Sequence, residues 1–126
     1  MSKFDTSNVV NMQYMFSECS NLISLDLTNF NTKSVEDIRG MFYYCYNLVS
    51  LDVSNFTTSS VTDMGYLFYY CTKLSSLYLM NFNTSLVTKM DGMFMGCYSL
   101  TSLNLFSFNT KIVNTMEYMF YYCYNL

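Results

Sequence analysis

Cysteine is the most reactive side chain in this sequence, and its spacing is regular. The five cysteines lie 26 residues apart, at Cys19, Cys45, Cys71, Cys97 and Cys123. Stacked structural units would place their Cα atoms about 5 Å apart, a distance that a disulfide allows. Side chains of one such column point the same way, however, and five is an odd number. We therefore predict a column of buried free thiols that act as small hydrophobic residues, with disulfides as the alternative.

Other reactive arrangements are missing from the sequence. A zinc site needs four converging ligands, which a straight column of cysteines cannot supply in a chain without histidine. We find no nucleophile elbow, no glycine-rich phosphate loop and no carboxylate pair that stands apart from the repeat. The sequence therefore predicts no metal, no cofactor and no enzymatic activity.

The spacing of 26 residues extends to about ten apolar columns. A fixed period of 20 to 50 residues is typical of solenoids, whose units bury their hydrophobic faces only by stacking on neighbours. Residues 1–126 are then a single repeat domain of nearly five repeats. Three of the apolar columns are Phe16, Phe42, Phe68, Phe94 and Phe120; Val9, Val35, Val61, Val87 and Val113; and Leu22, Leu48, Leu74, Leu100 and Leu126.

The spacing within one repeat predicts a helix followed by a strand. The apolar positions Val35, Ile38, Met41, Phe42, Cys45 and Leu48 follow the three-and-four spacing of one helical face. Leu51 and Val53 then alternate with polar residues, as in a short strand. Ser34 with Asp37, and Ser60 with Asp63, resemble capping boxes at the start of the helix. The sequence therefore predicts an α/β solenoid.

Both termini interrupt this pattern. Met1 occupies the column of Leu27, and Leu126 occupies the column of Leu22, so each terminus cuts through a strand and no polar capping repeat is visible. We expect either a fragment of a longer array or a unit that stacks end to end.

Composition excludes some partners. The net charge is -3 with only six basic residues, which provides no electrostatic surface for nucleic acid. No stretch approaches 18 uninterrupted apolar residues, so we expect no transmembrane segment. Charged residues make up 12 per cent of the chain and aromatic residues 19 per cent, which indicates that some aromatic surface contacts a partner.

The pattern Cys-x-x-Leu-x-x-Leu-x-Leu, seen from Cys45 to Val53 with valine in the last place, resembles the leucine-rich repeats of BspA-like surface proteins. The longer pattern Asn-Phe-x-Thr-x-x-Val-x-x-Met-x-x-Met-Phe-x-x-Cys-x-x-Leu is similar to the variant found in mollicute lipoproteins. The resemblance implies a right-handed leucine-rich-repeat-like coil without caps in this chain. It also implies a non-enzymatic array at the cell surface or outside the cell that serves adhesion or protein binding.

A first candidate binding surface lies on the predicted strands. Alternation buries Leu25 and Leu27 and points the residues between them outward. Along the stack the outward columns change from acidic and polar to aromatic, and Tyr78, Met80 and Phe106 could anchor a protein. The alternative is that these are ordinary isolated apolar residues. The two outward columns are Asp26, Asp52, Tyr78 and Asn104, and Thr28, Ser54, Met80 and Phe106.

A second candidate surface carries the tyrosines that flank the cysteines. Tyr44, Tyr70 and Tyr122 follow the helix and could face outward as recognition residues. The alternative is that they stack on one another between repeats as a structural column.

Two functions remain. The first is an array for protein interaction or adhesion, and the alternative is a structural rod or filament subunit that stacks head to tail. Ice binding by the Thr6, Thr32, Thr58, Thr84 and Thr110 column is disfavoured, because a flat face of two threonine columns is missing. Asn55 and Asn83 match glycosylation acceptors, a motif that arises often by chance.

Overall fold

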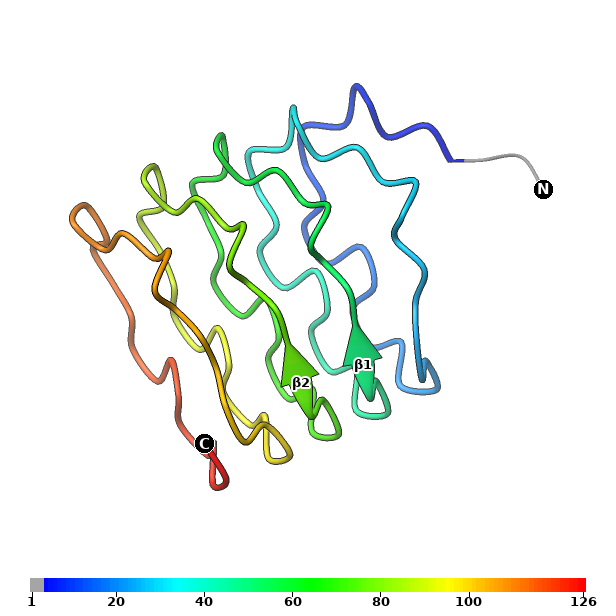
Figure 1. Cartoon of the computed structure of the whole chain (residues 1–126), viewed down its shortest axis with the longest axis vertical. Coiled ribbons are helices and arrows are strands. Elements are labelled where there is room, and N and C mark those ends of the chain that lie inside the picture. The colour runs from blue at the N-terminus through cyan, green and yellow to red at the C-terminus, as the bar shows by residue number, and fades with distance from the viewer. Residues whose placement is uncertain (1–3) are drawn as a thin grey trace.

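The computed structural model describes residues 4–126, which form five coils stacked side by side (Figure 1). We number the coils in chain order, as residues 4–26, 27–52, 53–78, 79–104 and 105–126. The expected strand position of Met1 lies outside the described residues.

Within residues 4–126, regular strand is confined to the middle of the stack. Strand β1, Ser50–Leu51, pairs in parallel with strand β2, Ser76–Leu77, with Ser50 opposite Ser76 and Leu51 opposite Leu77. In both strands the serine is exposed and the leucine is buried, which confirms the predicted alternation. A second line of parallel bridges joins all five coils through Asn11, Asp37, Asp63, Lys89 and Thr115.

The predicted helix is wrong: the part of the chain that the structure describes contains no helix. The segment 35–48 is a series of tight turns in which successive N–H groups alternate between two kinds of partner. The N–H of Gly40 donates to the carbonyl of Gly65 in the next coil at 2.9 Å, whereas the N–H of Met41 donates to Ile38 within its own coil at 3.1 Å. An α-helix would direct every one of these N–H groups to the carbonyl four residues back. The α/β helix-plus-strand solenoid is therefore replaced by coils that consist of turns and short parallel pairings.

The same apolar spacing explains why the sequence suggested a helix. Turns of three and four residues also return to one face, so the expected positions are all buried, at 1 per cent exposure or less: Val35, Ile38, Met41, Phe42, Cys45 and Leu48. The backbone, however, is left-handed at Gly40 and Tyr44, with φ of 58° at each, and a right-handed helix cannot pass through such residues. The predicted core is confirmed, while the backbone that presents it is different.

The expected capping boxes are also wrong, because there is no helix for them to cap. The Ser34 hydroxyl donates to the carbonyl of Ser7 in the previous coil at 3.2 Å. The Asp37 and Asp63 carboxylates instead accept the N–H groups two residues ahead, from Arg39 and Gly65, each at 2.9 Å. This is the Asx turn, in which a short acidic or amide side chain closes a corner of the backbone.

A ladder of phenylalanine rings forms the centre of the core. Consecutive rings lie 5.6 to 5.8 Å apart and within 12° of parallel along Phe16, Phe42, Phe68, Phe94 and Phe120. The ring of Phe68 is completely buried, whereas that of Phe120 in the last coil is 43 per cent exposed. Each coil thus buries its core only where a neighbour covers it.

Candidate binding surfaces

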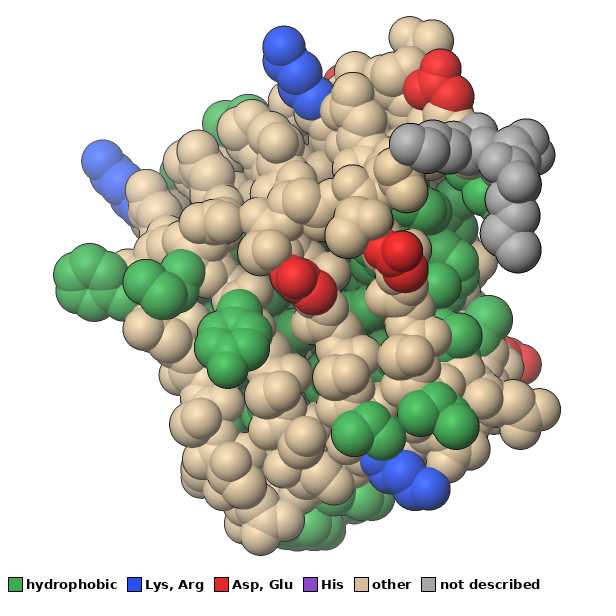
Figure 2. All heavy atoms as spheres, turned by 45° about the vertical axis from the view of Figure 1, so that its right-hand side comes forward, with side chains coloured by type: hydrophobic (Ala, Val, Ile, Leu, Met, Phe, Trp, Pro, Cys, Tyr) green, Lys and Arg blue, Asp and Glu red, His purple; other side chains and the backbone are tan. Residues whose placement is uncertain are grey.

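The first candidate surface follows the strand side of the stack, and we call it the strand-side surface. Its residues are Asp26, Asp52, Tyr78 and Asn104, with Thr28, Ser54, Met80 and Phe106. All eight side chains are exposed, as the alternation predicted, and the exposure of Tyr78, Met80 and Phe106 reaches 70, 64 and 96 per cent. Figure 2 shows apolar side chains gathered at one end of this face, beside two carboxylates. The surface therefore changes from acidic to apolar along the stack.

The acidic end of the strand-side surface also has a structural role that sequence reasoning missed. Asp26, Asp52 and Asn104 each accept the N–H two residues ahead, at 2.9 to 3.0 Å, and so close an Asx turn at the end of the strand-side segment of the coil. The backbone N–H of Thr28 lowers the pKa of Asp26, and the bond from the Ser54 side chain lowers that of Asp52. The hydroxyl residue two places after each aspartate was the available signal. Tyr78 lacks a side-chain acceptor for this turn, so its phenol extends into solvent.

Shallow hollows lie between neighbouring coils of this surface. One, of about 360 Å³, is lined by Ser50, Asp52, Ser54, Ser76 and Tyr78. It offers a carboxylate and hydroxyl groups beside an aromatic ring, but it encloses nothing. Such a surface suits a broad contact with a macromolecule better than capture of a small molecule.

The second candidate surface is less open than the sequence suggested. Tyr44, Tyr70 and Tyr122 are each only partly exposed, and the first two contact one another at 5.5 Å between ring centroids. Tyr43 stacks on Tyr69 of the next coil at 4.8 Å. Desolvation raises the pKa of Tyr69 and Tyr70 to about 12. These contacts support the structural alternative for Tyr44 and Tyr70.

Tyr122 differs, because it lies in the last coil. It contacts Tyr121 and Tyr124 at 4.0 and 5.7 Å, and both of those rings are exposed. The outer edge of this tyrosine cluster is therefore available at the C-terminal end of the stack.

The cysteines carry free thiols, three of them buried, and none forms a disulfide within the described residues. Each buried thiol has a partner: the Cys71 Sγ donates to the carbonyl of Phe42 at 3.2 Å, and Cys45 to that of Phe16 at 3.1 Å. Burial raises the pKa of the Cys45 thiol to about 11 and that of Cys71 well above its ordinary value. Since the thiolate is the reactive form, these thiols are chemically inert at neutral pH. The prediction of free thiols is confirmed, and that of burial holds for Cys45, Cys71 and Cys97, whereas Cys19 is exposed and Cys123 partly exposed. The carbonyl that each buried thiol contacts was missed.

Four of the five residues of the threonine column lie inside the structure, and Thr110 in the last coil is exposed. The Thr58 hydroxyl donates to the carbonyl of Asn83 at 3.0 Å and accepts the N–H of the same residue at 2.8 Å. Thr6, Thr32 and Thr84 make the same pair of bonds to the next coil. These four side chains are at most 4 per cent exposed, so they offer no surface to ice.

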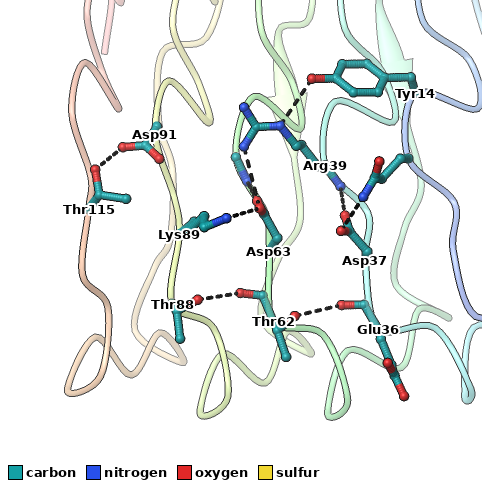
Figure 3. Close-up of polar contacts among 12 residues, drawn as sticks. Tyr14, Glu36, Asp37, Arg39, Thr62, Asp63, Thr88, Lys89, Asp91 and Thr115 are labelled. Carbon is teal, nitrogen blue, oxygen red and sulfur yellow. Dashed lines mark hydrogen bonds and ion pairs between the residues drawn. The ribbon is translucent and has the colours of Figure 1, made fainter.

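A charged cluster that sequence reasoning did not find lies on the bridged side of the stack (Figure 3). Asp63 is buried and lies 3.5 Å from Arg39 and 3.3 Å from Lys89. The Arg39 Nε–H also donates to the Tyr14 hydroxyl oxygen at 3.2 Å, and the guanidinium carbon lies 4.7 Å from the Tyr66 ring centroid. Among the described residues no buried side-chain nitrogen or oxygen of the cluster lacks a hydrogen-bond partner, which indicates a link between coils rather than a binding site.

The two glycosylation acceptors differ in their surroundings. The Asn55 side-chain amide donates to the carbonyl of Leu27 at 2.9 Å, so a glycan there would break a contact between coils. The side-chain Oδ1 of Asn83 accepts the N–H of Ser85 at 3.0 Å, and Asn83 is exposed. Among residues 4–126 no three potential metal ligands come close enough to hold an ion. In the same range there is no helix of the length and apolarity needed to cross a membrane.

Comparison with known proteins gives one match. Residues 1–50 and 45–126 match the family described as "Mycoplasma protein of unknown function, DUF285". The chain belongs to this family. Its whole length is accounted for by the match, in agreement with the expected likeness to mollicute repeat proteins. Neither a curated protein nor a solved structure was found to match the chain.

Proposed function

We propose that this chain is a non-enzymatic array that binds a protein or another surface ligand, and that it contributes to adhesion at the cell surface. The observation that carries the proposal is the exposed cluster of Tyr78, Met80 and Phe106 on the strand-side surface. Large aromatic side chains and methionine are enriched where proteins bind other proteins.

The framework beneath this cluster supports the same function. Residues of neighbouring coils are held in register by the β1 and β2 pairing and by bonds between coils, so Tyr78 and Phe106 need little ordering when a partner binds. Resemblance to BspA-like leucine-rich repeats adds the expectation of a location at or outside the cell surface. Because those repeats are associated with adhesion, adhesion is the form of binding that we propose.

Adhesion of coated beads to cultured epithelial cells tests this function. Beads that carry the chain should adhere, and a variant with Tyr78→Ser, Met80→Ser and Phe106→Ser should lose most of this adhesion while its circular dichroism spectrum stays the same. A matched control changes exposed apolar residues elsewhere, Ile23→Ser with Val49→Ser, which are 65 and 42 per cent exposed. Equal adhesion by the two variants would reject the strand-side cluster as the binding site.

Stacking through the ends of the array is a second candidate function, and the backbone favours it. Most bonds between the turn segments run one way: N–H groups such as those of Gly92 and Phe94 donate to carbonyls of the next coil, whereas that of Thr88 donates to the previous coil. The last coil therefore presents the N–H groups of Tyr118 and Phe120 outward, whereas the first coil presents carbonyls. Met116, Phe120 and Leu126 are also 43 to 47 per cent exposed at this end. A rod that grows head to tail would cover both sets of groups.

An appended coil tests the second candidate. A copy of residues Ile23–Leu48, joined after Leu126, continues the repeat in register. Its folding onto the last coil should raise the denaturation midpoint, because it buries Met116 and Phe120. A midpoint that stays the same would show that this end does not accept a coil.

A further inference from the structure

The two carboxylates of the strand-side surface have no partner cation within the part of the chain that the structure describes. Among residues 4–126 the ion pairs are those of Asp63, on the bridged side. Hydrogen bonds from the Thr28 backbone and from the Ser54 side chain lower the pKa of Asp26 and Asp52, so both are ionised at neutral pH. They are also the only charged residues in the four segments that form this surface. Those segments are residues 23–29, 49–55, 75–81 and 101–107.

The apolar part of the same surface lies on the side of the stack rather than at an end. Tyr78 belongs to the third coil and Met80 to the fourth, and both are exposed although a coil lies on each side of them. Apolar side chains exposed beside uncompensated charges of one sign fit a partner that carries apolar residues next to positive charge.

The order of these groups determines how such a partner lies. The carboxylates and the apolar side chains follow one another along the stack axis, so a partner that contacts both lies along that axis. Parallel pairing, as between β1 and β2, spaces the coils roughly 4.8 Å apart. One turn of an α-helix rises about 5.4 Å, so helix residues three or four apart meet successive coils. Residues on one side of an extended chain are about 6.6 Å apart, and they miss the next coil by about 2 Å at every step.

We infer that the strand-side surface binds an amphipathic α-helix of a partner protein, lying along the stack axis. Lysine or arginine side chains in two successive turns of this helix pair with Asp26 and Asp52. Apolar side chains in the following turns contact Tyr78 and Met80. The inference rests on the proposed function, binding through the strand-side cluster, and adds the chemistry and the direction of the partner.

Removing the two charges tests the pairing. Asp26→Asn with Asp52→Asn keeps the Asx turns, because Asn104 accepts the equivalent N–H in the fourth coil. In the bead assay this variant should adhere about 3- to 10-fold less than the unchanged chain, and high salt should reduce the difference. Glu36→Gln with Glu117→Gln is the matched control, since it removes two exposed carboxylates outside this surface and should leave adhesion unchanged.

Three synthetic peptides test the shape and the charge of the partner, by competing with the cells for the beads. The first places two lysines and then two leucines on one helical face. The second places the same residues at alternate positions of an extended chain, and the third is the first with glutamate in place of lysine. Only the first peptide should release the beads.

Each way in which the inference fails has its own result. Unchanged adhesion by the asparagine variant, while the variant with Tyr78→Ser, Met80→Ser and Phe106→Ser loses adhesion, would overturn the charge pairing and leave the proposed function intact. Stronger adhesion by the asparagine variant would also overturn it and would indicate an anionic ligand such as a sulfated polysaccharide. Equal release by the first two peptides, or release by neither, would overturn the helix. Adhesion that no variant lowers would overturn the inference together with the proposed function.

Discussion

At the scale of single residues, burial decides what the thiols do. Desolvation raises the pKa of Cys45 from 9.0 to about 11. An acid whose pKa is higher in the folded state loses its proton first in the unfolded chain. The contribution of this thiol to stability is therefore complete below pH 9 and is lost as the pH rises toward 11.

Alkaline denaturation should report this loss. Between about pH 8 and about pH 10.5 the free energy of unfolding should fall, and Cys45→Ala should make the fall smaller, because it removes one group that must stay protonated. Urea titrations at the two pH values measure it. Thr101→Ala is the control, since Thr101 is exposed and carries no titratable group, so this change should leave the fall as it is in the unchanged chain. If the free energy of unfolding of Cys45→Ala fell as much as that of the unchanged chain, the raised pKa of the Cys45 thiol would be contradicted.

Glycine residues provide a second test at this scale. Gly40→Ala should destabilise the chain by about 1–3 kcal/mol, because a Cβ there meets the Tyr14 ring on a left-handed backbone. Gly65→Ala is the matched control: its Cβ would lie 3.0 Å from the Arg39 Nη1, the movable end of a long side chain. Chemical denaturation of both variants measures the loss in the free energy of unfolding. An equal loss in Gly65→Ala and Gly40→Ala would argue against the packing of Tyr14 over Gly40.

At the scale of elements, the sequence predicts burial better than backbone. The positions from Val35 to Leu48 were correctly placed in the core, because any chain that returns to one face every three or four residues buries them. The spacing could not distinguish a helix from successive turns. The best local evidence against a helix was glycine at Gly40 and Gly92, because glycine weakens a helix. Tyrosine occupies the same column in the other coils, so this evidence was easy to overlook.

The sequence also predicted one candidate surface better than the other. Period-two alternation predicted the outward direction of Tyr78, Met80 and Phe106 correctly, since it is a local property of extended backbone. The edge-on contact of the Tyr44 ring with the Tyr70 ring depends on the distance and twist between coils, which a repeat period does not contain. The charged cluster around Asp63 was missed for the same reason: its members come from different coils.

The threonine bonds between coils give a prediction at this scale. Thr58→Val keeps the shape of the side chain but leaves the N–H and carbonyl of Asn83 without their partner, which should cost roughly 1–3 kcal/mol. Thr57→Val, at the adjacent exposed position, should change stability by less than about 0.5 kcal/mol. Denaturation midpoints of the pair measure the difference. Equal effects would mean that the buried hydroxyl contributes nothing beyond its shape.

At the scale of the whole molecule, stability should follow position along the stack. Phe68 is completely buried between two neighbouring rings, whereas Phe120 is 43 per cent exposed. We expect Phe68→Ala to cost about 3–5 kcal/mol. Phe120→Ala should cost about 1–2 kcal/mol, because less of its ring leaves water on folding. Amide exchange should then be fastest in the terminal coils, and uniform protection from coil to coil would contradict a stack stabilised by neighbours.

Every surface described above depends on coils that consist of turns and short parallel pairings, with no helix among the described residues. The backbone conformation of residues 35–48 and 61–74 tests this most directly, through ¹³Cα chemical shifts and HN–Hα couplings measured by nuclear magnetic resonance. The structure predicts left-handed values at Tyr44 and Tyr70, where φ is 58° and 53°, within segments that lack the continuous shifts of a helix. An unbroken run of right-handed helical values across either segment would contradict the account.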